Sequence, residues 1–263
     1  MPSHRDIHTE AETHWLRHAL LALVFIGGTW SGLAAREVPF EPFGETEAFL
    51  ARGVAGILTL PAGAPDRQTP AIIILQDTLG PDGRASRYTD QLLGAGFAVL
   101  EVQALEADAL GEVLNVLSAH PRVAGQPLRL LGFGLGARVA THWSGRVGAR
   151  ALLYPGCEGL SPAPMRGEAV LLMHGAADPA NAPGPCASFA QALGATGASV
   201  RLEVFDQASY AWDRVAYGNE GRSLLPRPDG RGRIIAEPWP ALAELSASGV
   251  AAFFAANLLG RRP

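Results

Sequence analysis

The stretch of sequence that decides the fold is Leu128–Ala140, LRLLGFGLGARVA. Its first residues, Leu128–Leu131, form a short apolar run typical of a buried strand, and its last residues have the pattern of a helix. Between them lies Gly132-Phe133-Gly134-Leu135-Gly136. Glycines at alternate positions indicate a turn so sharp that flanking side chains would collide. The central residue of the turn is Gly134, which has no side chain.

The chain on both sides of this turn repeats the strand–helix alternation. Further apolar runs predict strands at Gly56–Leu60, Ala71–Leu75, Phe97–Val102, Ala151–Tyr154, Ala169–Met173 and Val200–Phe205. Apolar stripes predict helices around Leu110, Val113, Leu114 and Leu117, and around Leu242, Leu245, Val250 and Phe253. Continuous apolar runs are typical of strands covered on both faces. We therefore expect an α/β fold, a mostly parallel sheet with helices on both faces, and we interpret Asn219–Pro240 as a long loop or an excursion.

The composition excludes several classes of protein. Hydrophobic residues make up 48% and charged residues 17% of the 263 residues, which is typical of a packed core and not of a disordered chain. The net charge of −4 argues against nucleic-acid binding. All 21 basic residues are arginine, so a phosphate-loop lysine, a Schiff-base lysine and a Ser–Lys dyad are excluded. His120, His142 and His174 are too scattered for a metal site, and we expect no cofactor.

The first 35 residues differ from the rest. Residues 19–35 carry no charge, begin with the apolar run ALLALVFIGG and end with small residues before Arg36. This order predicts a signal peptide over residues 1–35 and a single exported domain over residues 36–263. Two alternatives remain open: an uncleaved membrane anchor at residues 19–35, and a buried helix of a soluble protein.

The chain has two cysteines, Cys157 and Cys186. In an exported protein, an even pair indicates a disulfide, here closing a loop of about 30 residues. The alternative is that they are two separate buried thiols.

Two other strand ends carry polar residues. Asp178 follows the strand that ends near Met173, and Tyr210 follows the strand that ends at Phe205. Because catalytic groups of parallel α/β sheets gather beyond the carboxyl ends of the strands, these residues and the turn at Gly134 are expected to share one site.

From Gly56 to Leu258 the chain resembles the dienelactone hydrolase family of α/β-hydrolases. The residues that carry the resemblance are GFGLGA at the nucleophile turn, HGAADP at the acid turn and FDQASYAWD at the histidine turn. Asp82-x-Arg84-x-x-x-Tyr88 resembles the first helix of the family. The resemblance implies an α/β-hydrolase fold with Asp178 as the retained acid. It also places Gly134 where the family has its nucleophile and Tyr210 where the family has its histidine.

The expected activity follows from these replacements. Tyr210 is a poor resting base, because a phenol is protonated at neutral pH. An oxyanion site could survive, formed by the backbone amides of Leu135 and of Asp77 or Thr78. We therefore expect a non-hydrolytic protein that keeps the pocket and binds a small molecule or a protein partner. A membrane partner is expected only if the leader stays uncleaved. In that pocket Gly134 should have a positive φ, and Asp178 and Tyr210 should face it, with the phenol donating to the carboxylate.

Two other interpretations remain open. One is an active ester or lactone hydrolase with a displaced nucleophile, for which Cys157 and Ser209 are the candidates. The other is a dinucleotide-binding protein, because Gly132, Gly134 and Ala137 also fit the pattern Gly-x-Gly-x-x-Gly/Ala.

Overall fold

The computed structural model describes residues 44–62, 68–102, 107–123, 127–215 and 221–258. The chain divides into two compact units, residues 1–40 and residues 41–263. The first unit, with the expected signal peptide, lies outside the described residues, so the second unit contains all of them. In the described part of the chain, no helix is both long enough and apolar enough to cross a membrane.

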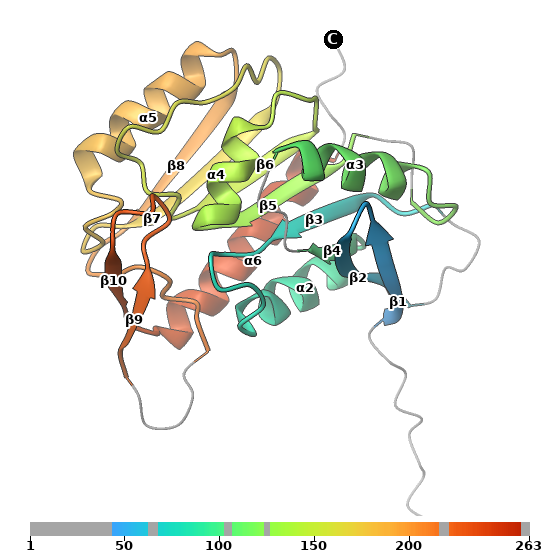
Figure 1. Ribbon diagram of the computed structural model, residues 1–263, viewed down its shortest axis with the longest axis horizontal. Helices are drawn as coiled ribbons and strands as arrows, with labels where there is room; N and C mark the ends of the chain where they lie inside the picture. Colours follow the sequence, from blue (N-terminus) through green and yellow to red (C-terminus); the bar gives the residue numbers. More distant parts are fainter. Residues whose placement is uncertain (1–43, 63–67, 103–106, 124–126, 216–220, 259–263) are drawn as a thin grey trace, which may run out of the picture. The chain divides into compact units, whose positions relative to one another are not determined.

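The core of the second unit is an eight-stranded sheet with the order β1-β2-β4-β3-β5-β6-β7-β8 (Figure 1). The strands are β1 (Gly44–Ala51), β2 (Val54–Pro61), β3 (Ala71–Leu75), β4 (Ala98–Val102), β5 (Arg129–Phe133), β6 (Ala149–Leu153), β7 (Ala169–Gly175) and β8 (Ser199–Phe205). β2 pairs antiparallel with both of its neighbours, β1 and β4. The remaining neighbours in the sheet, from β4 and β3 through to β7 and β8, pair parallel. The expected mostly parallel α/β sheet is confirmed.

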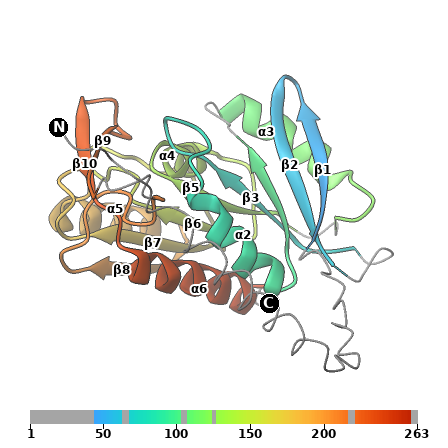
Figure 2. The ribbon, with the colours of Figure 1, turned by 90° about the horizontal axis from the view of Figure 1, so that it is seen from below.

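Helices cover both faces of the sheet. On one face α2 (Arg84–Gly94) and α6 (Pro240–Ala256) pack together, as Figure 2 shows. On the other face lie α3 (Ala107–Ser118), α4 (Leu135–His142) and α5 (Pro183–Ala195). The central strand β3, AIIIL, is buried along its whole length, which explains why its sequence is continuously apolar.

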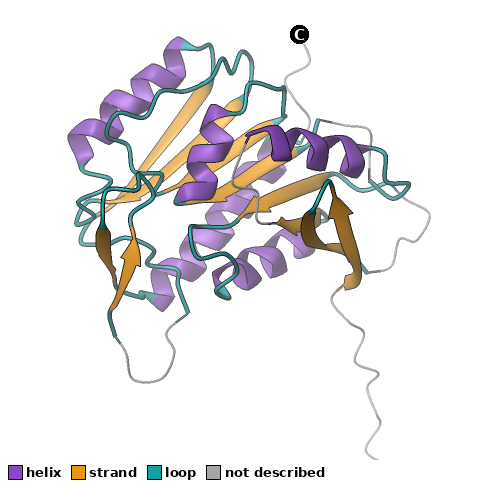
Figure 3. Cartoon of the chain, in the orientation of Figure 1, coloured by secondary structure: helices purple, strands orange, loops and turns teal. Residues whose placement is uncertain are grey.

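Three features differ from the sequence-based expectations. β1 was not predicted, because four consecutive exposed residues near its start hide the alternation of a strand. Leu245 does not join the apolar stripe of α6, because its side chain is 61% exposed. The expected loop at residues 219–240 contains a two-stranded hairpin, β9 (Ser223–Pro226) with β10 (Arg233–Ala236), drawn as strands in Figure 3.

The β9–β10 hairpin contributes to the core. Leu225 and Ile234 are buried in the same apolar cluster as Tyr154 and Trp212. At its end, Ala236 forms a β-bridge with Tyr210. The hairpin thereby helps to bury the aromatic residues that follow β6 and β8.

Candidate functional site

Gly134 lies in the turn between β5 and α4, with a φ of +48° and a ψ of −110°. This positive φ is the conformation expected of the turn, and glycine adopts it with little steric cost. The flanking glycines are required by close approach. A Cβ on Gly136 would lie 2.2 Å from the carbonyl oxygen of Leu75, and one on Gly132 would lie 2.5 Å from the amide of Ala137. The turn therefore has the geometry of a nucleophile elbow.

The space in front of Gly134 is occupied by two other side chains. A Cβ on Gly134 would lie 2.2 Å from the Asp77 Oδ1 atom and 2.2 Å from the Tyr210 hydroxyl. Real Cβ atoms essentially never approach other atoms so closely. A side chain at position 134 therefore requires Asp77 and Tyr210 to move.

The Asp77 carboxylate lies directly beyond β3. Its Oδ1 atom accepts a hydrogen bond from the Leu135 amide at 3.0 Å and another from the Thr78 amide at 2.8 Å. The two amides thus converge on one oxygen, at the distances at which an oxyanion hole holds its charged oxygen. Sequence reasoning proposed the Asp77 amide as a donor and missed the side chain. The signal was an acid immediately after a buried strand, with no histidine placed to use it.

The second carboxylate oxygen of Asp77 is also fully engaged. Oδ2 accepts a hydrogen bond from the Tyr210 hydroxyl at 2.6 Å and one from Arg84 Nη1 at 3.2 Å. Asp77 therefore receives two backbone donors, a phenol and a guanidinium. Bonds of this kind to a charged group are stronger than bonds between neutral groups.

Arg84 extends the network away from the turn. Its Nη1 atom also donates to the Tyr154 hydroxyl at 3.1 Å, and the Tyr154 hydroxyl donates to Asp213 at 2.7 Å. The other oxygen of Asp213 accepts from the Tyr88 hydroxyl at 2.7 Å. We refer to these six residues as the Asp77 cluster: Asp77, Arg84, Tyr88, Tyr154, Tyr210 and Asp213.

The Asp77 cluster is closed to solvent, since every member is at most 4% exposed. Burial by itself lowers the pKa of Arg84, but Tyr154 and the Asp82 carboxylate outweigh burial and hold that pKa above its usual value. Burial and the Asp77 carboxylate raise the pKa of Tyr210 well above that of a free phenol. Tyr210 therefore keeps its proton and acts as a donor, not as a base.

Asp178, the expected catalytic acid, lies beyond β7 in a different setting. Its carboxylate accepts hydrogen bonds from the Ala180 amide and from the Asn181 side chain, both at 2.8 Å. Its side chain makes no ion pair among the described residues. Because burial outweighs these two hydrogen bonds, the pKa of Asp178 is raised from 3.8 to about 6.

The expected contact between Tyr210 and Asp178 is not formed. The phenol donates to Asp77 instead, because Asp77 enters the space that the missing side chain of Gly134 leaves open. The expected pocket is also filled. Gly134, Asp178 and Tyr210 are all buried, and aromatic side chains such as Tyr154 pack against Tyr210.

Cys157 and Cys186 form a disulfide, which confirms the prediction for the pair. The bond connects the loop after β6 to α5 and is almost fully buried. Between the two cysteines and Asp178 lies Asn181, which accepts from the Gly156 amide and donates to Asp178. Neither cysteine is available as a nucleophile while this bond is intact.

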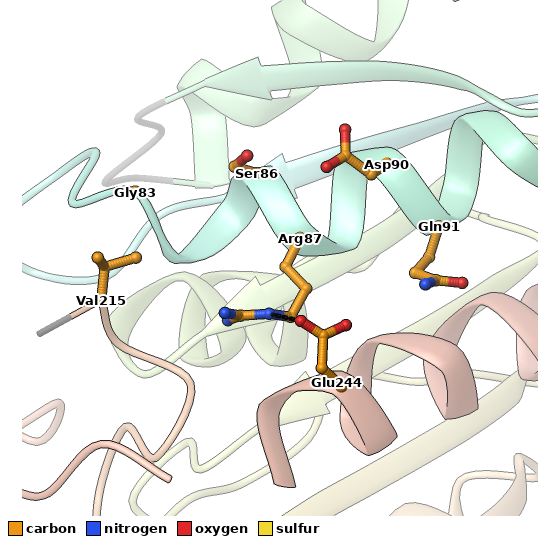
Figure 4. Close-up of a pocket in the computed structure, with 7 residues that line it drawn as sticks. All are labelled: Gly83, Ser86, Arg87, Asp90, Gln91, Val215 and Glu244. Carbon is orange, nitrogen blue, oxygen red and sulfur yellow. Dashed lines mark hydrogen bonds and ion pairs between the residues drawn. The ribbon is translucent and has the colours of Figure 1, made fainter. Parts of the chain in front are cut away.

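Arginine side chains can bind carboxylates, but Arg84, Arg87 and Arg138 all have partners within the protein. Arg84 belongs to the Asp77 cluster, and Arg138 donates to the carbonyls of Pro155 and Gly156. Arg87 pairs with Glu244 across a cavity of about 280 Å³ between α2 and α6 (Figure 4). Because Arg87 and Glu244 are both partly exposed to water, this pair contributes little stability.

Comparison with known proteins supports the fold. No family model and no curated protein matches the sequence. A putative dienelactone hydrolase from Klebsiella pneumoniae is similar in structure, with a TM-score of 0.60 and 16% identity over 81% of this chain and 98% of the other. Thermogutta terrifontis esterase 2 has a TM-score of 0.59 and 17% identity over 87% and 99%. Est1E from Butyrivibrio proteoclasticus has a TM-score of 0.58 and 12% identity over 82% and 99%. The chain therefore has the α/β-hydrolase fold of esterases and dienelactone hydrolases.

Proposed function

We propose that this chain is a non-hydrolytic protein with the α/β-hydrolase fold, and that it acts by binding a partner and not by turning over an ester. One observation carries the proposal. The Asp77 Oδ1 atom accepts hydrogen bonds from the Leu135 and Thr78 amides, which are the donors that an ester carbonyl would need. A substrate would have to displace a buried carboxylate that also binds Arg84 and Tyr210.

The other requirements of ester hydrolysis are also unmet at this turn. Gly134 offers no nucleophile, and Tyr210 holds its proton because its pKa is raised by burial. In serine proteases the loss of the nucleophile or of the base alone lowers turnover by about 10⁶. Asp178 keeps the position of the acid, but the group that it would orient is missing.

The two alternative interpretations gain no support from the site. Cys157 is held in a disulfide, and Ser209 is bound to the backbone of Glu237 through both its donor and its acceptor. For dinucleotide binding, the Leu135 amide would have to be free to bind a phosphate. It is already bound to Asp77, whose negative charge would repel a phosphate group.

Export is part of the proposal. The disulfide is compatible with an oxidising compartment, and the apolar run before Arg36 supports a signal peptide over residues 1–35. We expect the mature protein from its native host to begin near Arg36, which mass spectrometry of the intact protein measures. An intact Met1 in a soluble cytoplasmic fraction would contradict export.

The test of the non-hydrolytic role is to rebuild the missing chemistry in steps, with p-nitrophenyl acetate as substrate. The wild-type protein should show no turnover above a non-enzymatic control, and a fluorophosphonate probe should not label it. The double variant Gly134→Ser/Tyr210→His should stay inactive, because Asp77 still occupies the oxyanion hole. The triple variant that adds Asp77→Gly should exceed the double variant by at least about tenfold, because it frees the Leu135 and Thr78 amides to hold the oxyanion.

Asp178 supplies the matched control for the triple variant. Adding Asp178→Asn should remove most of the gained activity, because the new histidine would lose the acid that orients it. Wild-type hydrolysis that Ser209→Ala abolishes would refute the proposal and establish a displaced nucleophile. Fluorophosphonate labelling of the wild-type protein would refute it as well, whether or not the rebuilt variants fold.

A further inference from the structure

β8 is the last strand of the sheet, and its outer edge lies open to other described parts of the chain whether or not the site hydrolyses esters. β8 pairs with β7 on one side only, and it lies at one edge of the sheet in Figures 1 and 2, with β1 at the other edge. The Ser199 amide donates to Glu168, and the Phe205 carbonyl accepts from Ala176. In a parallel ladder alternate residues bond to the same neighbour, so the odd-numbered residues of β8 face β7.

The even-numbered residues of β8 therefore direct their backbone groups away from the sheet. These residues are Val200, Leu202 and Val204, and no bond from another described residue occupies this side of the strand. Leu202 is 37% exposed and Val204 is 42% exposed, although both are apolar. The strand contains no proline and no lysine, two residues that commonly protect a sheet edge from pairing with another chain, and its only charged residues are Arg201 and Glu203.

Charge on β8 favours one particular partner, namely a second copy of the same strand. Arg201 and Glu203 lie two residues apart on one face of β8 and form an ion pair along the strand. If two copies pair antiparallel with Leu202 opposite Leu202, each Arg201 lies opposite the Glu203 of the other copy. The same register places Val200 opposite Val204. Opposite charges and apolar pairs across strands stabilise a sheet.

Neighbouring registers are less favourable. A shift of the second copy by two residues in one direction places Arg201 opposite Arg201, and the same shift in the other direction places Glu203 opposite Glu203. Like charges directly opposite each other destabilise strand pairing. A shift by one residue would place Leu202 and its even-numbered neighbours opposite odd-numbered residues of the other copy, whose backbone groups already bond to β7. The charge pattern therefore selects the register centred on Leu202.

The opposite edge of the sheet lacks this self-complementarity. Its strand, β1, carries Glu45 and Glu47, and antiparallel pairing centred on Thr46 would place the two acids opposite each other. Beside β8, in contrast, the exposed apolar surface continues into a groove of about 350 Å³ whose lining includes Val204, Phe205 and the start of α6. Trp239 and Leu245 at this groove are 43% and 61% exposed.

We propose that two copies of this chain associate through β8, antiparallel about Leu202, and form one continuous sheet across the pair. In this register Leu202 is a hydrogen-bonded pair with its own copy, and Arg201 and Glu203 form two ion pairs between the copies. The exposed side chains of Trp239 and Leu245 then lie next to the interface.

Sedimentation of the full chain at low salt tests the charge pattern. The wild-type protein should form a dimer. Arg201→Glu alone and Glu203→Arg alone should each weaken dimerisation by at least about tenfold, because each converts both ion pairs into repulsive pairs. An equal mixture of the two variants should dimerise again, since opposite charges then face each other at both pairs. The double variant Arg201→Glu/Glu203→Arg should dimerise as the wild type does.

Cross-linking tests the register itself. Because hydrogen-bonded antiparallel residues have Cα atoms about 5.5 Å apart, Leu202→Cys should form a disulfide-linked dimer under mild oxidation. The control is Leu50→Cys on β1, which is more exposed at 70% but should remain unlinked. The two native cysteines are already bonded to each other and do not compete.

Three results would overturn the proposal. One is a wild-type protein that stays monomeric at high concentration and low salt. Another is a dimer that the two charge variants leave unchanged, which would place the interface elsewhere. The third is a monomer that captures an extended peptide along β8, which would assign the edge to a different partner.

Discussion

Asp77 and Asp178 both follow a buried parallel strand, and each is at most 4% exposed, yet their surroundings differ. Asp77 receives two amides, a phenol and the Arg84 guanidinium. Asp178 receives one amide and one side-chain amide, and its pKa is raised to about 6 because burial outweighs these bonds. The comparison teaches that the position of an acid at a strand end does not decide its role. The number and kind of donors that reach the carboxyl group differ between the two sites.

Removing the Asp77 carboxylate should have the largest effect. Asp77→Ala leaves the Tyr210 hydroxyl and two amides without an acceptor and removes one of the two carboxylates paired with Arg84, which keeps Asp82. It should therefore lower the free energy of unfolding by about 3–5 kcal/mol. Urea denaturation measures this loss. The control Asp90→Ala removes an exposed acid on α2 and should change the same quantity by less than about 0.5 kcal/mol.

A second measurement on Asp77→Ala sharpens the comparison. Formate has the size and charge of the group that is removed, so it should raise the melting temperature of this variant and leave that of the wild type unchanged. A loss of stability below about 1 kcal/mol, or equal stabilisation of both proteins by formate, would show that Asp77 is not the acceptor around which the cluster is organised.

Asp178→Asn should change how the free energy of unfolding depends on pH, and the size of this change should be intermediate. The folded-state pKa of Asp178, about 6, lies above its ordinary value of 3.8, so this carboxyl contributes stability at low pH that is lost as the pH rises through 6. Between pH 4 and pH 8 the loss is about 2–3 kcal/mol. The amide of the variant does not ionise, so the stability of the variant relative to wild type should improve by that amount over this range.

The outcome at each end of the range is informative. At pH 4 the folded wild-type carboxyl is protonated, so the variant replaces one neutral group by another and the two proteins should differ least in stability. Unfolding curves in urea at pH 4, 6 and 8 measure the gap between the two proteins. A gap that is constant across these values would mean that Asp178 is as well compensated as Asp77, and the contrast between the two acids would be lost.

Tyr210→Phe should have the smallest effect. It removes one donor to Asp77 and leaves Arg84, both amides and the Thr78 hydroxyl in place, so the expected loss in the free energy of unfolding is about 1–2 kcal/mol. Urea denaturation at pH 7 measures it, with Asp77→Ala as the reference. A loss equal to that of Asp77→Ala would place the centre of the cluster at the phenol and not at the carboxylate.

Most of the fold could be predicted from the sequence, because its signals are local. All seven predicted strands are present, because each contains a short apolar run between turn residues; β3, β5 and β6 are buried along their whole length, whereas β8 is an exposed edge strand. The edge strand β1 escaped prediction, because a strand with little buried surface needs little apolar alternation. The β9–β10 hairpin escaped for a related reason: only Leu225, Ile234 and Ala236 of its residues are deeply buried.

The contacts of the candidate site could not be predicted from the sequence. The motif at Gly134 and the acid at Asp178 pointed to the ends of β5 and β7, which is where these residues lie. What the motif could not show is the long-range contact between Asp77 and Tyr210, which are 133 residues apart in the chain. Arg84 illustrates the same limit. Nothing in the sequence distinguishes it as buried from the other arginines among the 21, yet its side chain is 2% exposed and joins Asp77 to Tyr154.

The contact between Asp77 and the Gly134 turn has a consequence for mutational paths from this sequence to a hydrolase. If Gly134→Ser comes first, the new side chain meets Asp77 and Tyr210 at 2.2 Å, at a backbone φ that disfavours any residue but glycine. If the loss of Asp77 comes first, the Tyr210 hydroxyl and the Leu135 and Thr78 amides lose their acceptor before any nucleophile exists to benefit. Either order passes through an unstable and inactive intermediate. Because the effects of contacting residues are not additive, the two positions are epistatic. The present arrangement therefore disfavours the return of catalysis through single substitutions.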